Sequence, residues 1–122
     1  NRLAGRITSV DGDTCRVDVD GGGSVVANAI NIDGNGARTT LSLMPERVTV
    51  NPEAGSLPNI FDAKVKELIY LGDHIRTRVD VCGHDDFVVK IPNSSHHDSL
   101  HVGNEVKVGW NVEDCLALDP SD

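Results

Sequence analysis

The densest group of metal-binding side-chain types lies in one polar stretch near the C-terminal end of the sequence. His96, His97 and His101, with Asp98 between them, offer three imidazoles and a carboxylate. Zn²⁺ accepts both kinds of ligand. Their spacing matches no established zinc motif, and the segment 92–99 is predicted as an exposed loop that would not hold them on one face. The three histidines remain candidates for a metal site beside the favoured interpretation, a solvated loop.

Two acidic turns contain part of a calcium-loop pattern. The segment 18–23 has carboxylates at the first and third loop positions and glycine at the sixth, but its twelfth position is Ala29 instead of a bidentate glutamate. The segment 33–36 fails in the same way, because its twelfth position is Met44. Ordinary turn chemistry explains both segments. The glycines at 21–23 precede a strand and not a helix, which indicates a hairpin turn and not a phosphate cradle.

The sequence shows no arrangement typical of nucleophilic catalysis. Cys15, Cys82 and Cys115 are odd in number, far apart and without a C-x-x-C motif, which indicates reduced, buried thiols. None of the serines follows the pattern of a nucleophile elbow. The pair Asp85-Asp86 is predicted at a charged hairpin tip. We therefore expect no catalytic residues, and we expect that this chain is not an enzyme.

Composition and charge exclude several partners. The 122 residues fit one domain, and 11 basic against 19 acidic residues give a net charge of −8. Nucleic-acid binding needs a basic surface, so a nucleic-acid partner is not expected. No apolar run approaches the roughly 20 residues that cross a bilayer, so direct membrane insertion is not expected either.

The elements that must position these residues are strands. Alternation of apolar and polar residues is clearest in the segments 16–20, 78–81, 87–91 and 106–110. A period of two is the pattern of half-buried strands. Frequent glycine, asparagine and aspartate turns between them are typical of a barrel or sandwich, and any helix is expected to be short. The predicted fold class is all-β.

The sequence also resembles itself. The matching pieces are Gly12-Asp13 with Gly72-Asp73, 16–19 with 78–81, 25–26 with 88–89, and 46–50 with 113–118. The second copy inserts two residues between Gly-Asp and the following arginine, and an even insertion keeps every later side chain on its own face. We predict one domain over 1–122 with an internal duplication, 1–50 and 57–122, joined by a connector at 51–56. Each half is too short for its own core, so the halves are expected to share one.

An ordered set of short motifs runs through the chain. Its members are Pro45, Glu46, Tyr70, Leu71, Gly72, Asp73, His74, Pro92, Asn93, Gly103 and Trp110. This set resembles the C-terminal TOBE domain of ABC-importer ATPase subunits, and within that family the polyamine (spermidine/putrescine) branch. The segment 1–7 resembles the first strand after the ATPase domain. Met44 replaces the arginine usual before Pro-Glu, and Asn104 stands where aspartate is common; neither change threatens the fold.

The resemblance implies an OB-fold or MOP-like barrel built from two duplicated β modules, with little helix. It implies a regulatory and dimerisation domain of the ATP-binding subunit of an ABC importer, with polyamines or a similar small solute as substrate. The expected partners are a second copy, the ATPase domain of the same chain and the importer membrane subunits. The expected location is the cytoplasmic face of the bacterial inner membrane.

The resemblance places ATP and Mg²⁺ in the ATPase domain, whose Walker and signature motifs do not occur in this sequence, so no cofactor is expected here. The sequence opens on Asn1 and not on methionine, so we expect a fragment of a longer protein or a trimmed chain. An alternative stays open, a small-ligand sensor for an oxyanion or a polyamine. Its available hydroxyl donors are Thr8, Ser9, Thr39, Thr40 and Ser42.

Overall fold

A computed structural model describes residues 1–92 and 100–120 and shows two β-sheets. The strands are β1 (Arg2–Asp11), β2 (Thr14–Val19), β3 (Ser24–Ala29), β4 (Arg38–Leu43), β5 (Thr49–Val50), β6 (Asn59–Tyr70), β7 (His74–Val81), β8 (His84–Pro92), β9 (Glu105–Trp110) and β10 (Cys115–Leu118). Two single-turn 3₁₀ helices, η1 (Pro45–Arg47) and η3 (Val112–Asp114), are the helical segments among the described residues. The predicted all-β, barrel-type fold with little helix is confirmed.

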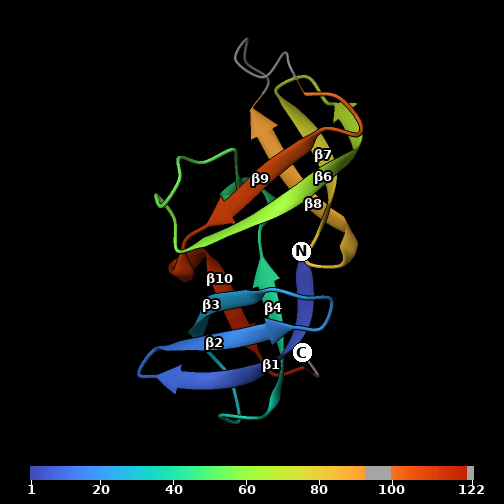
Figure 1. The fold of residues 1–122 in the computed structure, drawn as a ribbon. Coiled ribbons are helices and arrows are strands. Elements are labelled where there is room, and N and C mark those ends of the chain that lie inside the picture. Colours follow the sequence, from blue (N-terminus) through green and yellow to red (C-terminus); the bar gives the residue numbers. More distant parts are fainter. Residues whose placement is uncertain (93–99, 121–122) are drawn as a thin grey trace.

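The two sheets form two modules that exchange strands. The first module is a closed barrel in the order β1-β2-β3-β10-β4, and the second is a five-stranded sheet in the order β5-β9-β6-β7-β8. The barrel is the lower lobe of Figure 1 and the second sheet is the upper lobe. The last strand of the chain, β10, completes the first module, whereas β5 from the first half pairs with β9 in the second. Neither module is therefore built from one half alone.

Alternating side chains fill a common apolar core, as their period predicts. Val17 and Val19 are buried in β2, and Val79 and Val81 are buried in β7. The core has few aromatic residues, and Trp110 is its largest fully buried side chain. Its indole ring packs against two phenylalanine rings, at centroid distances of 5.3 Å and 5.7 Å. Valine, isoleucine and leucine supply most of the remaining volume.

Both modules repeat one local irregularity. The long strands β1 of the first module and β6 of the second each carry a register shift, after Ile7 and after Val65. The amide of Ile7 donates to the Ala37 carbonyl at 2.9 Å, and its carbonyl accepts from the Gly36 amide at 2.7 Å. Val65 does the same with residues 103–104, at 2.9 and 2.8 Å. Each module thus contains one β-bulge, and the segment just before a neighbouring strand, 36–37 or 103–104, holds it with two backbone hydrogen bonds.

Strand register sets the equivalence between the modules. Arg16 of β2 pairs with Val26, and Arg78 of β7 pairs with Val88, so Val26 and Val88 are equivalent. The match of 25–26 with 88–89 in the sequence is therefore shifted by one residue, because Phe87 stands at the place of a valine. The boundaries of the duplication, 1–50 and 57–122 with the connector 51–56, stay a prediction.

Two asparagines hold the modules together. The amide of Asn59, at the start of β6, donates to the carbonyl of Val26 and accepts from its N–H, both at 2.9 Å. Asn1 makes the same two hydrogen bonds to Val88, at 2.7 and 2.8 Å. Asn59 thus satisfies the N–H and carbonyl of a residue of β3, and Asn1 does the same for a residue of β8. Backbone groups that are shielded from water need such partners.

The second module stays open between β8 and β5, and two features of the sequence account for it. In the first module β10 runs parallel to β3, and Ile30 just beyond β3 donates its N–H to the carbonyl of Ala117 at 3.2 Å. Pro92 holds the equivalent place at the end of β8. Proline has no N–H to donate, and it is tolerated on edge strands for that reason. β5 is also only two residues long, and it pairs with β9 alone.

Candidate functional site

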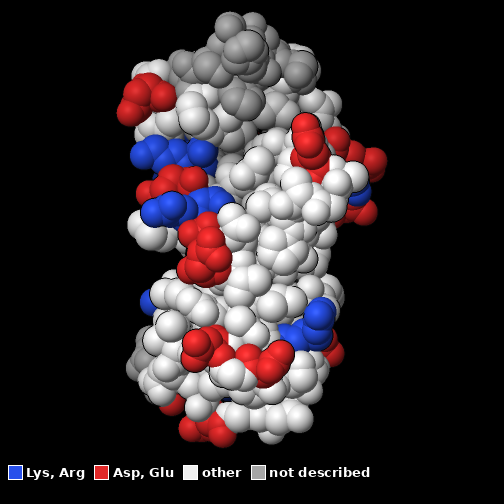
Figure 2. Space-filling view, turned by 90° about the vertical axis from the view of Figure 1, so that its left-hand side faces the viewer, with Lys and Arg blue, Asp and Glu red and all other residues white. Residues whose placement is uncertain are grey.

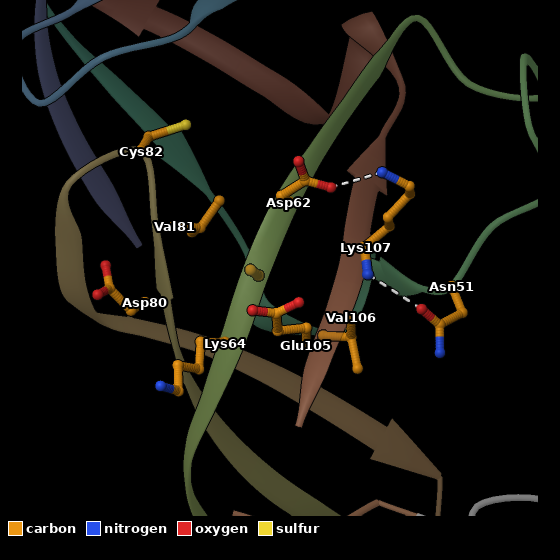
Figure 3. A pocket seen from close by; sticks show the side chains of 10 residues that line it. Asn51, Asp62, Lys64, Asp80, Val81, Cys82, Glu105, Val106 and Lys107 are labelled. Carbon is orange, nitrogen blue, oxygen red and sulfur yellow. Dashed lines mark hydrogen bonds and ion pairs between the residues drawn. The ribbon is translucent and has the colours of Figure 1, made fainter. Parts of the chain in front are cut away.

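A groove of about 720 Å³ crosses β9, β6 and β7 on the second module. The close-up in Figure 3 shows charged side chains from these three strands around it. Its lining residues are Asn51, Asp62, Ala63, Lys64, Asp80, Val81, Cys82, Glu105, Val106 and Lys107. The groove is open and shallow, which suits contact with a surface better than enclosure of a substrate.

Opposite charges alternate across the groove. Strand register places Asp62 opposite Lys107, and Lys64 lies between Glu105 of β9 and Asp80 of β7. The Lys107 ammonium and the Asp62 carboxylate form an ion pair with 2.5 Å between Nζ and Oδ1. Figure 2 shows such an alternation of basic and acidic side chains over the upper lobe. These charges largely neutralise one another, so the groove does not strongly favour a free cation or anion.

The groove does not contain an activated nucleophile. Burial raises the pKa of the Cys82 thiol to about 11, so the thiol is protonated at neutral pH. Asn51, at the other end, has a left-handed backbone with φ of 52° and accepts the Lys107 N–H on its side-chain oxygen at 3.0 Å. The side-chain amide of Asn51 therefore continues the pairing with β9 just beyond the last residue of β5. The groove thus combines alternating charged side chains with a protonated thiol.

The hairpin motif of residues 70–74 forms the turn between β6 and β7. The Leu71 amide donates to the carbonyl of His74 at 2.9 Å, and Gly72 has a φ of 80°, which glycine adopts without strain. His74 Nδ1 lies 2.8 Å from the Asp73 carboxylate, and this hydrogen bond lowers the pKa of Asp73. Tyr70 and Leu71 remain exposed beside the turn. This motif thus shapes a hairpin.

The other motif residues also serve turns and core, and they do not converge on one site. Pro45 and Glu46 begin η1, and Trp110 ends β9 in the core. Gly103, with a φ of 92°, donates to the carbonyl of Val65 at 2.8 Å. Asn93, a further motif residue, lies outside the described residues.

The structure describes one of the three histidines predicted as metal-binding candidates. His96 and His97 lie outside the described residues, and His101 is exposed. Within 1–92 and 100–120, no three histidine, cysteine, aspartate or glutamate side chains lie close enough together to hold a metal ion.

Two of the hydroxyl donors considered for an oxyanion are occupied by the fold. Thr39 is buried and donates to the carbonyl of Leu118 at 2.7 Å. Thr8 donates to the carbonyl of Arg16 at 3.3 Å. The alternative of an anion sensor loses these two donors, because a hydroxyl has one proton to donate.

The inter-module clamps of Asn1 and Asn59 were missed by the sequence reasoning. A signal was present for Asn59, which is buried and is the first residue of β6, whereas Asn1 lies just before β1. An asparagine is unusual at a buried strand position, since its amide needs partners there. Aligning the two halves from their first strands, and not only from the Arg-Val-Asp-Val match, would have paired these residues.

Two five-stranded β modules that exchange strands define the class, a small barrel-type β domain. A family model described as "TOBE domain" matches residues 41–118, well over half of the sequence. The chain belongs to the TOBE domain family, which occurs in the ATPase subunits of ABC importers. The predicted family is confirmed.

One curated relative is the spermidine/putrescine import ATP-binding protein PotA of Trichodesmium erythraeum (strain IMS101). It is 27% identical over 89 residues, which are 70% of this chain and 23% of the relative. The chain therefore spans about a quarter of the length of that protein. Among the described residues, no helix is long and apolar enough to pass through a bilayer.

Among solved structures, the chain is similar to the cytoplasmic molybdate-binding protein ModG in a crystal form with molybdate bound. The TM-score is 0.81, and the match covers 98% of this chain and 96% of ModG at 14% sequence identity. At that identity the likeness shows a shared fold.

Proposed function

We propose that this chain is the regulatory and dimerisation domain of the ATP-binding subunit of an ABC importer for polyamines or a similar small solute. The observation that carries the proposal is the family match over residues 41–118, and the similarity to the PotA relative supports the choice of a polyamine importer. In this proposal the domain works on the cytoplasmic face of a bacterial inner membrane.

The physical character of the surface supports a role in contact. The groove across β9, β6 and β7 holds alternating acidic and basic side chains, and its one thiol is protonated. The motif residues that the structure describes lie mainly in turns, strands and core. ATP and Mg²⁺ belong, in this proposal, to an ATPase domain, and transport chemistry belongs to that domain and the membrane subunits. The contribution of this chain is to pair with a second copy and to steady the ATPase dimer.

Light scattering at rising protein concentration tests the dimerisation. We expect a dimer whose interface buries on the order of 1,200–2,000 Å² in total. ATP hydrolysis by this chain alone is expected to be absent. Turnover of ATP would contradict the proposal.

A small-ligand sensor is the second candidate, and the fold shared with a molybdate-binding protein favours it. The net charge of −8 and the occupied hydroxyls of Thr8 and Thr39 speak against an anion. Calorimetry with molybdate, spermidine and putrescine separates the two functions. Submicromolar binding of any of the three would establish the sensor, whereas the regulatory proposal predicts none of that strength.

A further inference from the structure

The outer face of β6, β7 and β8 carries two cations side by side. Strand register places Ile69 opposite Arg76, and Arg76 opposite Lys90, in one row across the three strands. All three side chains are exposed. Like charges that lie directly opposite each other in a sheet repel and destabilise it. We call these three residues the Arg76–Lys90 face.

The counter-charge that this row needs is not supplied by the described part of the chain. No ion pair among the described residues includes Arg76 or Lys90. The charge of Lys90 contributes to lowering the pKa of Asp73, but the Asp73 carboxylate is hydrogen-bonded to His74. Within the described residues, the row therefore holds two exposed positive charges without a paired carboxylate, on a chain whose net charge is −8.

The neighbouring row shows how this face looks when a carboxylate is present. Arg78 lies opposite Glu67 on β6, with 3.7 Å between Nε and Oε1. Arg78 also donates to the carbonyl of Asp85 at 2.7 Å. One row of the sheet is internally compensated, and the next, two residues further along β7, is not.

The fold itself does not require these cations. In the first module the places of Arg76 and Lys90 are held by Thr14 and Asn28, which pair in the same register. The same architecture is thus built with two neutral side chains. Arg76 and Lys90 carry a repulsive cost that the first module avoids, which is the pattern of residues kept for recognition and not for folding.

We propose that the Arg76–Lys90 face docks a segment of a partner protein that presents a carboxylate beside an apolar side chain. The carboxylate lies between Arg76 and Lys90, and the apolar side chain packs on Ile69. A polyanion such as nucleic acid fits poorly, because the chain carries a net charge of −8 that would repel it. A free small anion would leave Ile69 uncovered. The inference rests on the proposed function, in that it supplies the regulatory domain with a partner contact.

The test uses a probe peptide and a variant copied from the first module. The probe is a hexapeptide of alternating leucine and glutamate, and its analogue carries glutamine in place of glutamate. The variant is Arg76→Thr with Lys90→Asn, and the matched control is Arg16→Gln, an exposed arginine on β2. Binding is followed by NMR chemical-shift titration at low and high salt, and folding by thermal unfolding.

We expect shifts confined to the region of Ile69, Arg76 and Lys90, and binding that salt weakens. The double variant should bind the glutamate peptide at least about fivefold more weakly than the native chain does. The native chain should bind the glutamine analogue with a similar loss of affinity. The control should bind as the native chain does. The double variant should unfold at the same temperature or a higher one, because repulsion has been removed.

Three results would overturn the inference. One is equal binding of the two peptides, or of native and double-variant chains. Another is a lower unfolding temperature of the double variant, which would make the cations structural. The third is displacement of the peptide by submillimolar inorganic phosphate, which would make a free anion the occupant. Sizing of the same samples reports dimerisation independently, so a monomer that binds the peptide contradicts the proposed function alone.

Discussion

Gly21 and Gly83 lie against each other where the two modules meet, backbone on backbone. They are equivalent residues: Gly21 lies in the hairpin turn between β2 and β3, and Gly83 lies in the turn between β7 and β8. A Cβ on Gly21 would come within 2.2 Å of the carbonyl oxygen of Cys82, and a Cβ on Gly83 within 2.6 Å of the Gly21 Cα. Glycine is required at this contact because of space.

Gly21→Ala is therefore expected to separate the two turns and to cost about 2 kcal/mol of unfolding free energy. Urea unfolding followed by the fluorescence of Trp110, the one tryptophan in the sequence, measures it. Ser24→Ala, at an exposed position just beyond the same turn, is the control and should change little. A Gly21→Ala variant as stable as the native chain would show that the modules do not meet through these turns.

Removing the Asn59 clamp is expected to lower the unfolding free energy by more than Gly21→Ala does. Asn59→Leu keeps the size of the side chain but leaves the N–H and carbonyl of Val26 without their partner, at an expected cost of about 2–3 kcal/mol. Asn1→Ala should cost about 1 kcal/mol, because Asn1 is less buried than Asn59. The same urea titration serves, with Asn35→Ala at an exposed turn as the control. Equal stability of Asn59→Leu and the control would refute the clamp.

The exposed ion pair of the first module predicts a pH effect. Arg38 donates to the Asp20 carboxylate, and this hydrogen bond holds the pKa of Asp20 below its usual range. The unfolded chain then binds a proton more readily, so the contribution of Asp20 to stability is complete above about pH 4 and is lost as pH falls further. Asp20→Asn should lower the urea midpoint slightly at pH 7, and the difference should vanish near pH 2.

Salt provides the control for this pair. Because Arg38 and Asp20 are both exposed, 1 M sodium chloride should shrink the difference between the native chain and Asp20→Asn. Asp33→Asn, at another exposed aspartate, is the matched control variant. If the difference in urea midpoint between the native chain and Asp20→Asn grew as the pH fell, the pKa of Asp20 would be raised by folding and not lowered.

Thiol chemistry gives a further prediction. Burial raises the pKa of Cys115 to about 12 and that of Cys82 to about 11, and it also raises the pKa of Cys15. At pH 8 the reactive thiolates are therefore scarce, and the native chain should react slowly with Ellman's reagent, Cys82 first. Three thiols should appear at once in 6 M urea. A rapid reaction of one thiol in the native chain would contradict the burial.

Strands were predictable from the sequence because alternation reports burial locally. Val17 and Val19, or Phe87 and Val89, face the core as their spacing requires. The exchange of β5 and β10 was not predictable in the same way, since it depends on where a distant strand leaves an edge unpaired. Pro92 signalled that edge only once its equivalence to Ile30 was known from the register.

The candidate surface was harder to predict than the fold. Arg76 and Lys90 are distant in sequence, and only the β7–β8 register makes them neighbours. The groove across β9, β6 and β7 likewise joins residues from three strands. Clustered histidines drew attention because they are adjacent in sequence, whereas Asn59 is a lone residue whose role depends on one backbone group in the other module.

Sedimentation equilibrium of the purified chain tests the central claim, that this domain acts by associating with a second copy. We expect a mass that rises with concentration from 13.0 kDa toward twice that value, with no ligand added. A single 13.0 kDa species up to millimolar protein would contradict the proposed dimerisation.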